Sequence, residues 1–175
     1  MIIGFAGYKR SGKSEATRVM LARGYRELKM ADPLKDMLRT LYRYSRYSVD
    51  EVEERIEGSL KEVEDSFLGN TPRVAMQQLG TEWRDAINTN LWSDIWYRRV
   101  RELTQRFGTN VVCSDIRFKH EIERIHELGG RVYWINRTSE RSDSHVSETN
   151  IAALCDGTIW NTGTLESFRE QIQKL

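Results

Sequence analysis

The N-terminal stretch of the chain, residues 1–14, constrains the fold more than any other part of the sequence. Residues 2–6 are an apolar run that predicts a buried strand, and residues 15–22 predict a helix. Between them, GYKRSGKS fits the pattern G-x-x-x-x-G-K-[ST] at its fixed positions, Gly7, Gly12, Lys13 and Ser14. A glycine-rich turn that caps a helix and binds nothing is the weaker interpretation. Strand, turn and helix in this order predict a phosphate-binding loop (P-loop).

The residue types in this loop explain how it would bind phosphate. Glycines let the backbone turn so that successive N–H groups point at an anion, and the following helix adds its positive N-terminal end. Lys13 is long enough to reach the terminal phosphates of a nucleotide. The Ser14 hydroxyl suits Mg²⁺, a hard cation that prefers oxygen ligands.

Composition favours a cytoplasmic enzyme. With 175 residues the chain is most simply one domain, residues 1–175, and it is long enough to bury a core. The net charge of +1 gives no general electrostatic case for binding nucleic acid or an anionic membrane. The two cysteines, Cys113 and Cys155, favour a reduced compartment over a disulfide framework. No apolar stretch approaches the ~20 residues of a membrane span, and the N-terminus shows no signal-peptide pattern.

Strands and helices alternate along the rest of the chain. After the first strand and helix we expect strands at residues 25–31, 110–115, 131–135 and 158–160, and helices at residues 34–44, 90–107, 119–128 and 165–174. A capping box at Ser48 and Glu51 predicts a further helix with an apolar stripe as far as Phe67, and Thr71-Pro72 predicts the start of another. Repeated strand-helix-strand units favour a parallel sheet with right-handed crossovers. The predicted fold is therefore an α/β, three-layer P-loop NTPase sandwich.

The helix at residues 90–107 carries several aromatic residues and arginines. We expect one face to point inward, with Trp92, Trp96, Val100, Leu103 and Phe107. The arginines at positions 98, 99, 101 and 106 lie mostly off this face and are expected to be solvated. Because no aromatic residue is interleaved with them on the same face, direct nucleic-acid binding is not expected.

A carboxylate ends the strand at residues 110–115. Ligands of an open parallel sheet gather at the carboxyl ends of its strands, so Asp115 is expected beside the P-loop, where it is a candidate Mg²⁺ ligand through water. Arg117 is a candidate phosphate clamp, and a salt bridge between Asp115 and Arg117 is the less favoured alternative. Glu121 lies four residues after Arg117 and is expected to do no more than orient the arginine.

A P-loop defines a class of ligand and leaves the reaction open. The chain has neither the D-x-x-G switch nor the N-K-x-D guanine reader of a regulatory GTPase, and an ATPase motor would need greater length. Several loops instead carry arginines, at Arg10, Arg73, Arg117, Arg137 and Arg141. Guanidiniums that converge on one place suit a second phosphate and the charge that moves between two phosphates. The sequence therefore predicts a small-molecule kinase.

Six segments together resemble the deoxynucleoside monophosphate kinases of tailed bacteriophages. They are GYKRSGKS (7–14), ADPLKDML (31–38), RVAMQQLGTEWR (73–84), SDIRFKHE (114–121), INR (135–137) and SHVSE (144–148). The P-loop is generic, whereas the combination is specific and extends over nearly the whole chain; only the acidic segment 46–70 has no match. The resemblance implies transfer of the γ-phosphoryl group of ATP to a deoxynucleoside 5′-monophosphate with Mg²⁺, in the host cytoplasm if the gene belongs to a phage.

The resemblance also implies roles for individual residues. It assigns the ATP phosphates to Gly7, Lys9, Ser11, Gly12, Lys13 and Ser14, with Arg10 adding positive charge. Arg73 and Gln77 are one helical turn apart, and the resemblance places the arginine at the acceptor phosphate and the amide at its base. Asp32 and Lys35 are candidates for the acceptor sugar or phosphate, although Asp32 is equally well explained as an N-cap before Pro33. Trp83 is a candidate for a base pocket or for the core.

Two regions complete the predicted architecture: a helical acceptor-binding insertion at residues 46–108 and a lid at residues 137–147. The lid segment is almost wholly polar, so we expect it to close over the phosphates and to bring Arg137 and Arg141 to the site only with substrate. His145 and Glu148 match the family pattern without a derivable role. Two alternatives stay open, a kinase with another acceptor such as a dephospho-coenzyme A kinase, and an ATP-binding module that transfers no phosphate. The sequence also leaves open whether the protein is a monomer or a homodimer.

Overall fold

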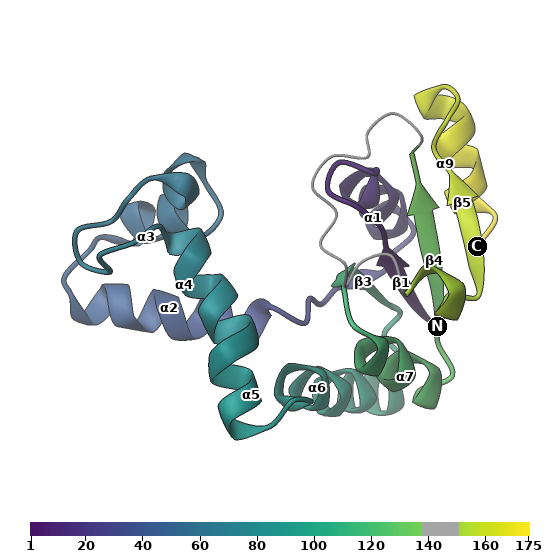
Figure 1. Ribbon diagram of the computed structural model, residues 1–175. Coiled ribbons are helices and arrows are strands. Elements are labelled where there is room, and N and C mark those ends of the chain that lie inside the picture. The colour runs from purple at the N-terminus through teal and green to yellow at the C-terminus, as the bar shows by residue number, and fades with distance from the viewer. Residues whose placement is uncertain (138–150) are drawn as a thin grey trace. The chain divides into compact units, whose positions relative to one another are not determined.

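The computed structural model describes residues 1–137 and 151–175 (Figure 1). The chain forms two compact units. The first unit contains Met1–Met30 and Ser93–Leu175, and the second contains Ala31–Trp92. Each unit has a hydrophobic core made from its own residues.

A five-stranded parallel sheet forms the centre of the first unit, with the strands in the order β2-β3-β1-β4-β5. The strands are β1 (Ile2–Ala6), β2 (Arg26–Glu27), β3 (Val111–Ile116), β4 (Arg131–Asn136) and β5 (Gly157–Trp160). All five residues of β1 are buried, which explains why it reads as a continuous apolar run. In the sheet β1 lies between β3 and β4. From β1 the chain continues through α1 (Lys13–Ala22) to β2 at one edge, and from β4 it continues to β5 at the other edge. The carboxyl end of β1 therefore lies at a topological switch point, where ligands of such sheets bind.

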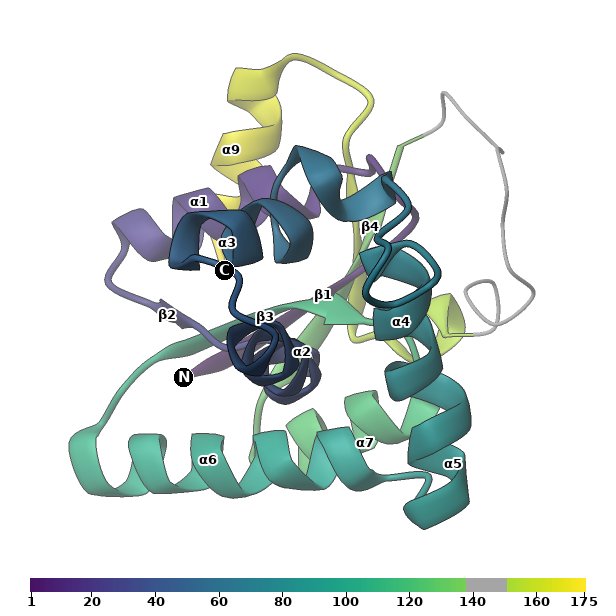
Figure 2. The ribbon, with the colours of Figure 1, turned by 90° about the vertical axis from the view of Figure 1, so that its left-hand side faces the viewer.

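Helices cover both faces of this sheet (Figures 1 and 2). Ile3, Phe5 and Val112 point to one face and share a core cluster with α1 (Lys13–Ala22) and α9 (Leu165–Gln173). Alternate strand residues such as Ile2 and Val111 share the other cluster with α6 (Leu91–Phe107) and α7 (Lys119–Glu127). The predicted α/β three-layer architecture with a central parallel sheet is therefore confirmed.

The second unit is helical. Its elements are α2 (Asp32–Tyr44), α3 (Val49–Ile56), the 3₁₀ turn η1 (Ser59–Glu62), α4 (Pro72–Gln78), the wider π-type turn η2 (Leu79–Trp83) and α5 (Arg84–Ile87). Leu34, Leu38, Tyr42, Val52, Ile56, Met76 and Trp92 form its core. Both predicted helix starts are confirmed: Ser48 and Glu51 make a reciprocal capping box, and the Thr71 hydroxyl accepts the Val74 amide.

Three local predictions are wrong. The second strand is limited to Arg26–Glu27, because only this part of the segment 25–31 pairs with β3. The acidic helix ends at Ile56 and does not reach Phe67, which is 45 % exposed, because the Glu54 carboxylate captures the Ser59 amide that would continue the helix. Phe107, expected to point inward, is 62 % exposed at the last turn of α6.

The expected insertion at residues 46–108 overlaps the second unit only in part. The core of this unit takes Leu34 and Leu38 from α2, whereas Trp96 and Val100 of α6 lie in the core of the first unit. That the whole chain acts as one kinase domain stays a prediction. Neither cysteine forms a disulfide in the structure, and none of the helices in the described parts of the chain is both long and apolar enough to cross a membrane.

Candidate active site

The loop between β1 and α1 has a backbone that requires glycine at two positions. Gly7 and Gly12 have φ angles of 144° and 116°, in the region that favours glycine. A Cβ atom at Gly7 would lie 2.6 Å from the Ile135 carbonyl oxygen, and one at Gly12 would lie 2.6 Å from Asn161 Nδ2. At both positions the positive φ angle and the close neighbouring atoms therefore disfavour any residue other than glycine.

Lys13 closes over this loop from the first turn of α1. Its ammonium group donates hydrogen bonds to the carbonyl oxygens of Gly7 and, at 2.8 Å, of Tyr8. A nucleotide phosphate would offer the ammonium group a stronger, charge-assisted acceptor than these neutral carbonyls. Ser14 is exposed beside it, whereas the Ser11 hydroxyl is buried and has no hydrogen-bond partner among the described residues.

Two residues that sequence reasoning missed hold the loop in place. Asn161, directly after β5, donates from Nδ2 to the Ser11 carbonyl oxygen at 2.8 Å, and its own amide donates to Asn136 at 2.8 Å. Arg169 of α9 pairs with Glu15 of α1 at 2.6 Å. Asn161 and Ser11 are 150 positions apart, so the sequence gives no local signal of this contact.

Two of the five candidate arginines lie beside one another at the loop. Arg137 follows β4, and its Nη1 atom lies 3.5 Å from the carbonyl oxygen of Arg10, which has a positive φ of 65° in the loop itself. Arg117 is exposed just beyond β3. Arg141 lies outside the described residues, as do His145, Glu148 and all of the expected lid except Arg137.

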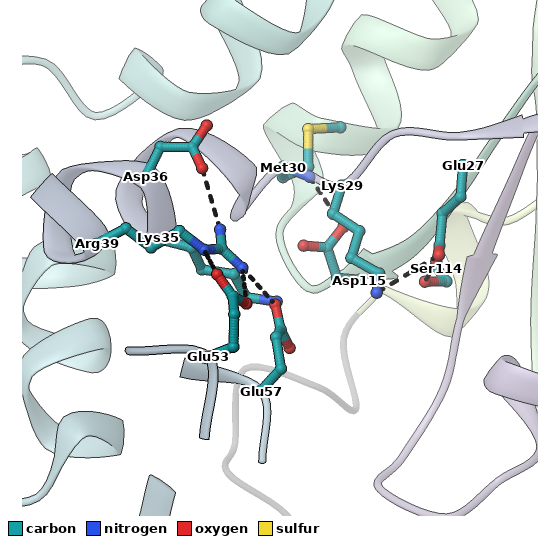
Figure 3. A network of polar contacts seen from close by, with 10 residues as sticks. All are labelled: Glu27, Lys29, Met30, Lys35, Asp36, Arg39, Glu53, Glu57, Ser114 and Asp115. Carbon is teal, nitrogen blue, oxygen red and sulfur yellow. Dashed lines mark hydrogen bonds and ion pairs between the residues drawn. The ribbon is translucent and has the colours of Figure 1, made fainter. Parts of the chain in front are cut away.

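Asp115 lies at the same edge of the sheet as the P-loop, because Ala6 of β1 pairs in register with Ile116 of β3. Its Oδ1 atom accepts the Met30 amide at 3.0 Å (Figure 3). The Arg117 side chain is exposed, and its role as a phosphate clamp stays a prediction. Glu27, a second carboxylate at this edge that the sequence did not single out, accepts the Ser114 hydroxyl and lies 3.5 Å from Lys29 Nζ (Figure 3).

Glu121 caps the start of α7. One of its carboxylate oxygens accepts the amides of Arg117 at 2.6 Å and Phe118 at 3.0 Å, so it orients the Arg117 backbone and not the guanidinium. Burial raises the pKa of Glu121 to about 7, although the two amides act in the opposite direction. The Glu121 carboxyl is therefore expected to change its charge near pH 7.

The oxygen donors of the first unit suit Mg²⁺ in the way that nucleotide enzymes commonly bind it. Mg²⁺ usually takes one or two carboxylates and completes its shell with substrate phosphates and water. Ser14 and Asp115 are the predicted donors. Among the described residues no three His, Cys, Asp or Glu side chains form a cluster that would hold a metal without a nucleotide.

Lys35 and Arg73, candidates for the acceptor phosphate, both lie in the second unit and both are ion-paired. Lys35 is 8 % exposed and its Nζ atom lies 2.6 Å from Glu57 (Figure 3). Arg73 pairs through Nε with Glu62, and the exposed Gln77 lies one turn further along α4. Asp32 is the first residue of α2, after Ala31 at the cap position, so the N-cap interpretation of Asp32 is wrong.

The second unit also contains a hollow of about 530 Å³ with a mostly apolar wall. Trp83 contributes to its wall, is 39 % exposed and stacks on the buried Trp92 with ring centroids 5.7 Å apart. The remaining wall residues are Leu38, Leu41, Leu68, Ala75, Gln78, Leu79 and Glu82. Such a hollow has the flat aromatic surface and apolar wall that a nucleobase would need.

The parallel sheet and the loop between β1 and α1 together have the arrangement of a P-loop fold. Two solved structures share the fold: a dephospho-CoA kinase from Campylobacter jejuni (TM-score 0.53, 16 % identity, 99 % of this chain and 94 % of that one) and a protein from Thermus thermophilus (TM-score 0.51, 16 % identity, 99 % and 95 %). At this identity they show the fold alone.

Sequence comparison identifies the family. Residues 53–172 match the model of the deoxynucleotide monophosphate kinase family. A protein of Acanthamoeba polyphaga mimivirus named "Putative deoxynucleotide monophosphate kinase" is 33 % identical over 190 residues, covering 98 % of this chain and 94 % of its own length. The chain belongs to the deoxynucleotide monophosphate kinase family, which confirms the resemblance found in the sequence.

Proposed function

We propose that the protein transfers the γ-phosphoryl group of ATP to a deoxynucleoside 5′-monophosphate. The observation that carries this proposal is the family match, since it extends over residues 53–172 and so includes the segment with Arg73 and Gln77. In the reaction an oxygen of the acceptor phosphate bonds to the γ-phosphorus while the bond to the bridging oxygen of ADP breaks. The products are ADP and a deoxynucleoside diphosphate.

On the donor side, the P-loop binds the phosphates of ATP. The backbone between Gly7 and Ser14 supplies N–H groups, and Lys13 exchanges the carbonyl oxygens of Gly7 and Tyr8 for phosphate oxygens. Mg²⁺ held by Ser14, by phosphate oxygens and through water by Asp115 would neutralise part of the phosphate charge. Asn161 keeps the loop in this shape by binding the Ser11 carbonyl.

Arginines supply the charge that the transferring group needs. Arg10 and Arg137 lie beside one another at the loop, and Arg117 lies beyond the neighbouring strand. We assign Arg141 and the lid role of residues 137–147 on the same chemical grounds. Phosphoryl transfer depends almost wholly on positioning and on electrostatic stabilisation, so these side chains act on kcat more than on ground-state binding.

On the acceptor side, we assign the phosphate to Arg73 and Lys35, the base to Gln77 and Trp83, and the sugar to Asp32. Arg73 supports this assignment because its side chain is 35 % exposed and its partner Glu62 is more exposed still, so a phosphate can replace the carboxylate. Trp83 offers an aromatic ring on which the base can stack, and its own stacking on Trp92 supports the position of that ring.

Release of ADP from ATP tests this function directly. The acceptors are the four deoxynucleoside monophosphates, the four ribonucleoside monophosphates and dephospho-coenzyme A, with Lys13→Ala and an acceptor-free reaction as controls. We expect ADP with at least one deoxynucleoside monophosphate and none with dephospho-coenzyme A. Turnover of dephospho-coenzyme A alone would assign a different acceptor, and ATP binding without turnover of any acceptor would describe a binding module.

A further inference from the structure

The hydroxyl of Ser11 is buried inside the P-loop and has no hydrogen-bond partner among the described residues. The residue as a whole is 3 % exposed. A buried hydroxyl without a partner costs free energy, because it gives up its hydrogen bonds to water and gains none from the protein. Any role for it in nucleotide binding rests on the proposed function, since Ser11 belongs to the loop that we assign to ATP.

The position of this hydroxyl does not suit direct contact with a phosphate. Its oxygen atom is buried, whereas a phosphate enters the loop from solvent. The oxygen faces the Gly7 backbone and lies 2.8 Å from the place that a Cβ atom of Gly7 would take. The Ser11 backbone is held as well, because Asn161 Nδ2 donates to its carbonyl oxygen at 2.8 Å. The hydroxyl can therefore change direction only within the loop.

Two backbone carbonyls of the same turn are the natural acceptors for this hydroxyl. A serine hydroxyl commonly donates to the carbonyl oxygen three or four positions earlier in the chain. For Ser11 these carbonyls belong to Tyr8 and Gly7. The chain already turns as such a bond requires, because the Ser11 amide donates to the Tyr8 carbonyl at 3.1 Å.

Lys13 occupies both of these carbonyls in the structure. Its ammonium group donates to the Gly7 carbonyl and, at 2.8 Å, to the Tyr8 carbonyl. The Tyr8 oxygen thereby accepts the ammonium group and the Ser11 amide, which uses both of its lone pairs. The hydrogen bonds of an ammonium group are charge-assisted and stronger than those of a hydroxyl. Lys13 therefore holds the acceptors that Ser11 would otherwise use.

Binding of ATP would free these acceptors, because Lys13 then turns to phosphate oxygens. A carbonyl left without a donor in this partly buried loop would weaken nucleotide binding. We propose that the Ser11 hydroxyl donates to the carbonyl of Gly7 or Tyr8 that Lys13 leaves, while water can take the other. Ser11 is then a positioning residue: it acts through the loop backbone and stabilises the form of the loop in which Lys13 binds phosphate.

Thermal unfolding of the protein without ligand tests this exchange through a double-mutant cycle. Lys13→Ala frees both carbonyls permanently, so the Ser11 hydroxyl should already be bonded in that background. There, Ser11→Ala should lower the unfolding temperature by about 3 °C, the effect of losing one hydrogen bond in a chain of this size. In the wild-type background the same substitution removes a hydroxyl without a partner, so the unfolding temperature should stay unchanged or rise.

Calorimetric titration with ATP and Mg²⁺ tests the effect on nucleotide binding. Ser11→Ala should weaken ATP binding about tenfold, equivalent to about 1.4 kcal/mol, although the protein without ligand is no less stable. Thr104→Val is the matched control for both measurements, since the Thr104 hydroxyl already donates to the Val100 carbonyl at 2.9 Å. It should cost the same stability in both backgrounds and leave ATP affinity unchanged.

Additive effects of Ser11→Ala and Lys13→Ala on the unfolding temperature would overturn the proposal, because the hydroxyl would then have the same surroundings in both backgrounds. Additive unfolding together with weakened ATP binding would mean that the hydroxyl contacts the phosphate directly. Unchanged ATP affinity in Ser11→Ala would also overturn it. The unfolding measurement uses neither nucleotide nor acceptor, so its result stands even if no deoxynucleoside monophosphate is phosphorylated.

Discussion

The two units build their candidate phosphate sites from different parts of the chain. In the first unit the P-loop is shaped by backbone: Gly7 and Gly12 are fixed by their φ angles and close neighbours, and the Asn161 amide holds the loop. In the second unit the candidate site consists of charged side chains, and each cation assigned to phosphate already has a carboxylate partner. A backbone site is ready before its ligand arrives, whereas a side-chain site must exchange one anion for another.

This difference sets what mutations should reveal. Loss of a group in the P-loop removes charge from a preorganised site, so catalysis should suffer strongly. Loss of a cation in the second unit also releases its carboxylate partner to solvent. The net loss of binding free energy is therefore smaller than the loss of the cation alone would give. Effects should therefore be larger in the first unit than in the second.

Lys13→Ala should lower kcat by about 10² to 10³ or more, because the ammonium group is assigned to the charge of the transferring phosphoryl group. The unfolding temperature should hardly change, since the carbonyl oxygens of Gly7 and Tyr8 can bind water instead. Steady-state ADP release measures the loss, with Lys119→Ala on α7 as a surface-lysine control. Near-normal turnover in a folded variant would mean that the loop does not serve ATP.

Arg137→Ala should lower kcat by about 10² and weaken ATP binding much less, because an arginine that meets the transferring group acts mainly in the transition state. Arg141→Ala should behave in the same way. Arg131→Ala is the matched control, since Arg131 is exposed at the opposite end of β4. Single-turnover rates and ATP titration separate the two effects, and equal losses in rate and in ATP affinity would assign Arg137 to ground-state binding.

Glu121→Gln should change how stability depends on pH. Burial raises the pKa of Glu121 from 4.5 to about 7, so its stabilising contribution is present below the unfolded value and is lost as pH rises through about 7. Relative to the variant, the wild-type protein should therefore lose about 2 kcal/mol of unfolding free energy between pH 5 and pH 8.

Urea unfolding at several pH values measures this difference. Glutamine can still accept the amides of Arg117 and Phe118, so the cap itself is kept. Glu123→Gln, exposed on the same helix, is the control. A stability difference that does not vary with pH would show that Glu121 is ionised in the folded protein throughout this range.

Arg73→Ala should raise KM for the deoxynucleoside monophosphate about tenfold and leave ATP affinity unchanged, because the released Glu62 reduces the net loss. Arg46→Ala in the same unit is the control. Acceptor kinetics at saturating ATP, with ATP titration beside them, measure both effects. If ATP binding falls and acceptor dependence does not, donor and acceptor have been assigned to the wrong units.

Local patterns were sufficient where the contacts are local. The P-loop motif predicted the strand before it and the helix after it, and the structure has both. The capping box of Ser48 and Glu51 and the N-cap Thr71 predicted two helix starts that the structure confirms. Such features depend on residues within four positions of one another, so a pattern can encode them. The same reasoning failed for the acidic helix, because the capture of the Ser59 amide by Glu54 competes with a continuing apolar stripe.

The sequence by itself therefore determined the P-loop, the order of strands and helices and, through six scattered segments, the family. Only the tertiary structure decided which distant side chains meet: Asn161 with Ser11, Lys35 with Glu57, and Arg73 with Glu62. The physical reason is that a backbone turn is fixed by the conformational limits of its own residues, whereas an ion pair or an anchoring amide depends on packing that brings separate elements together. Charge patterns alone do not say which carboxylate a cation will find.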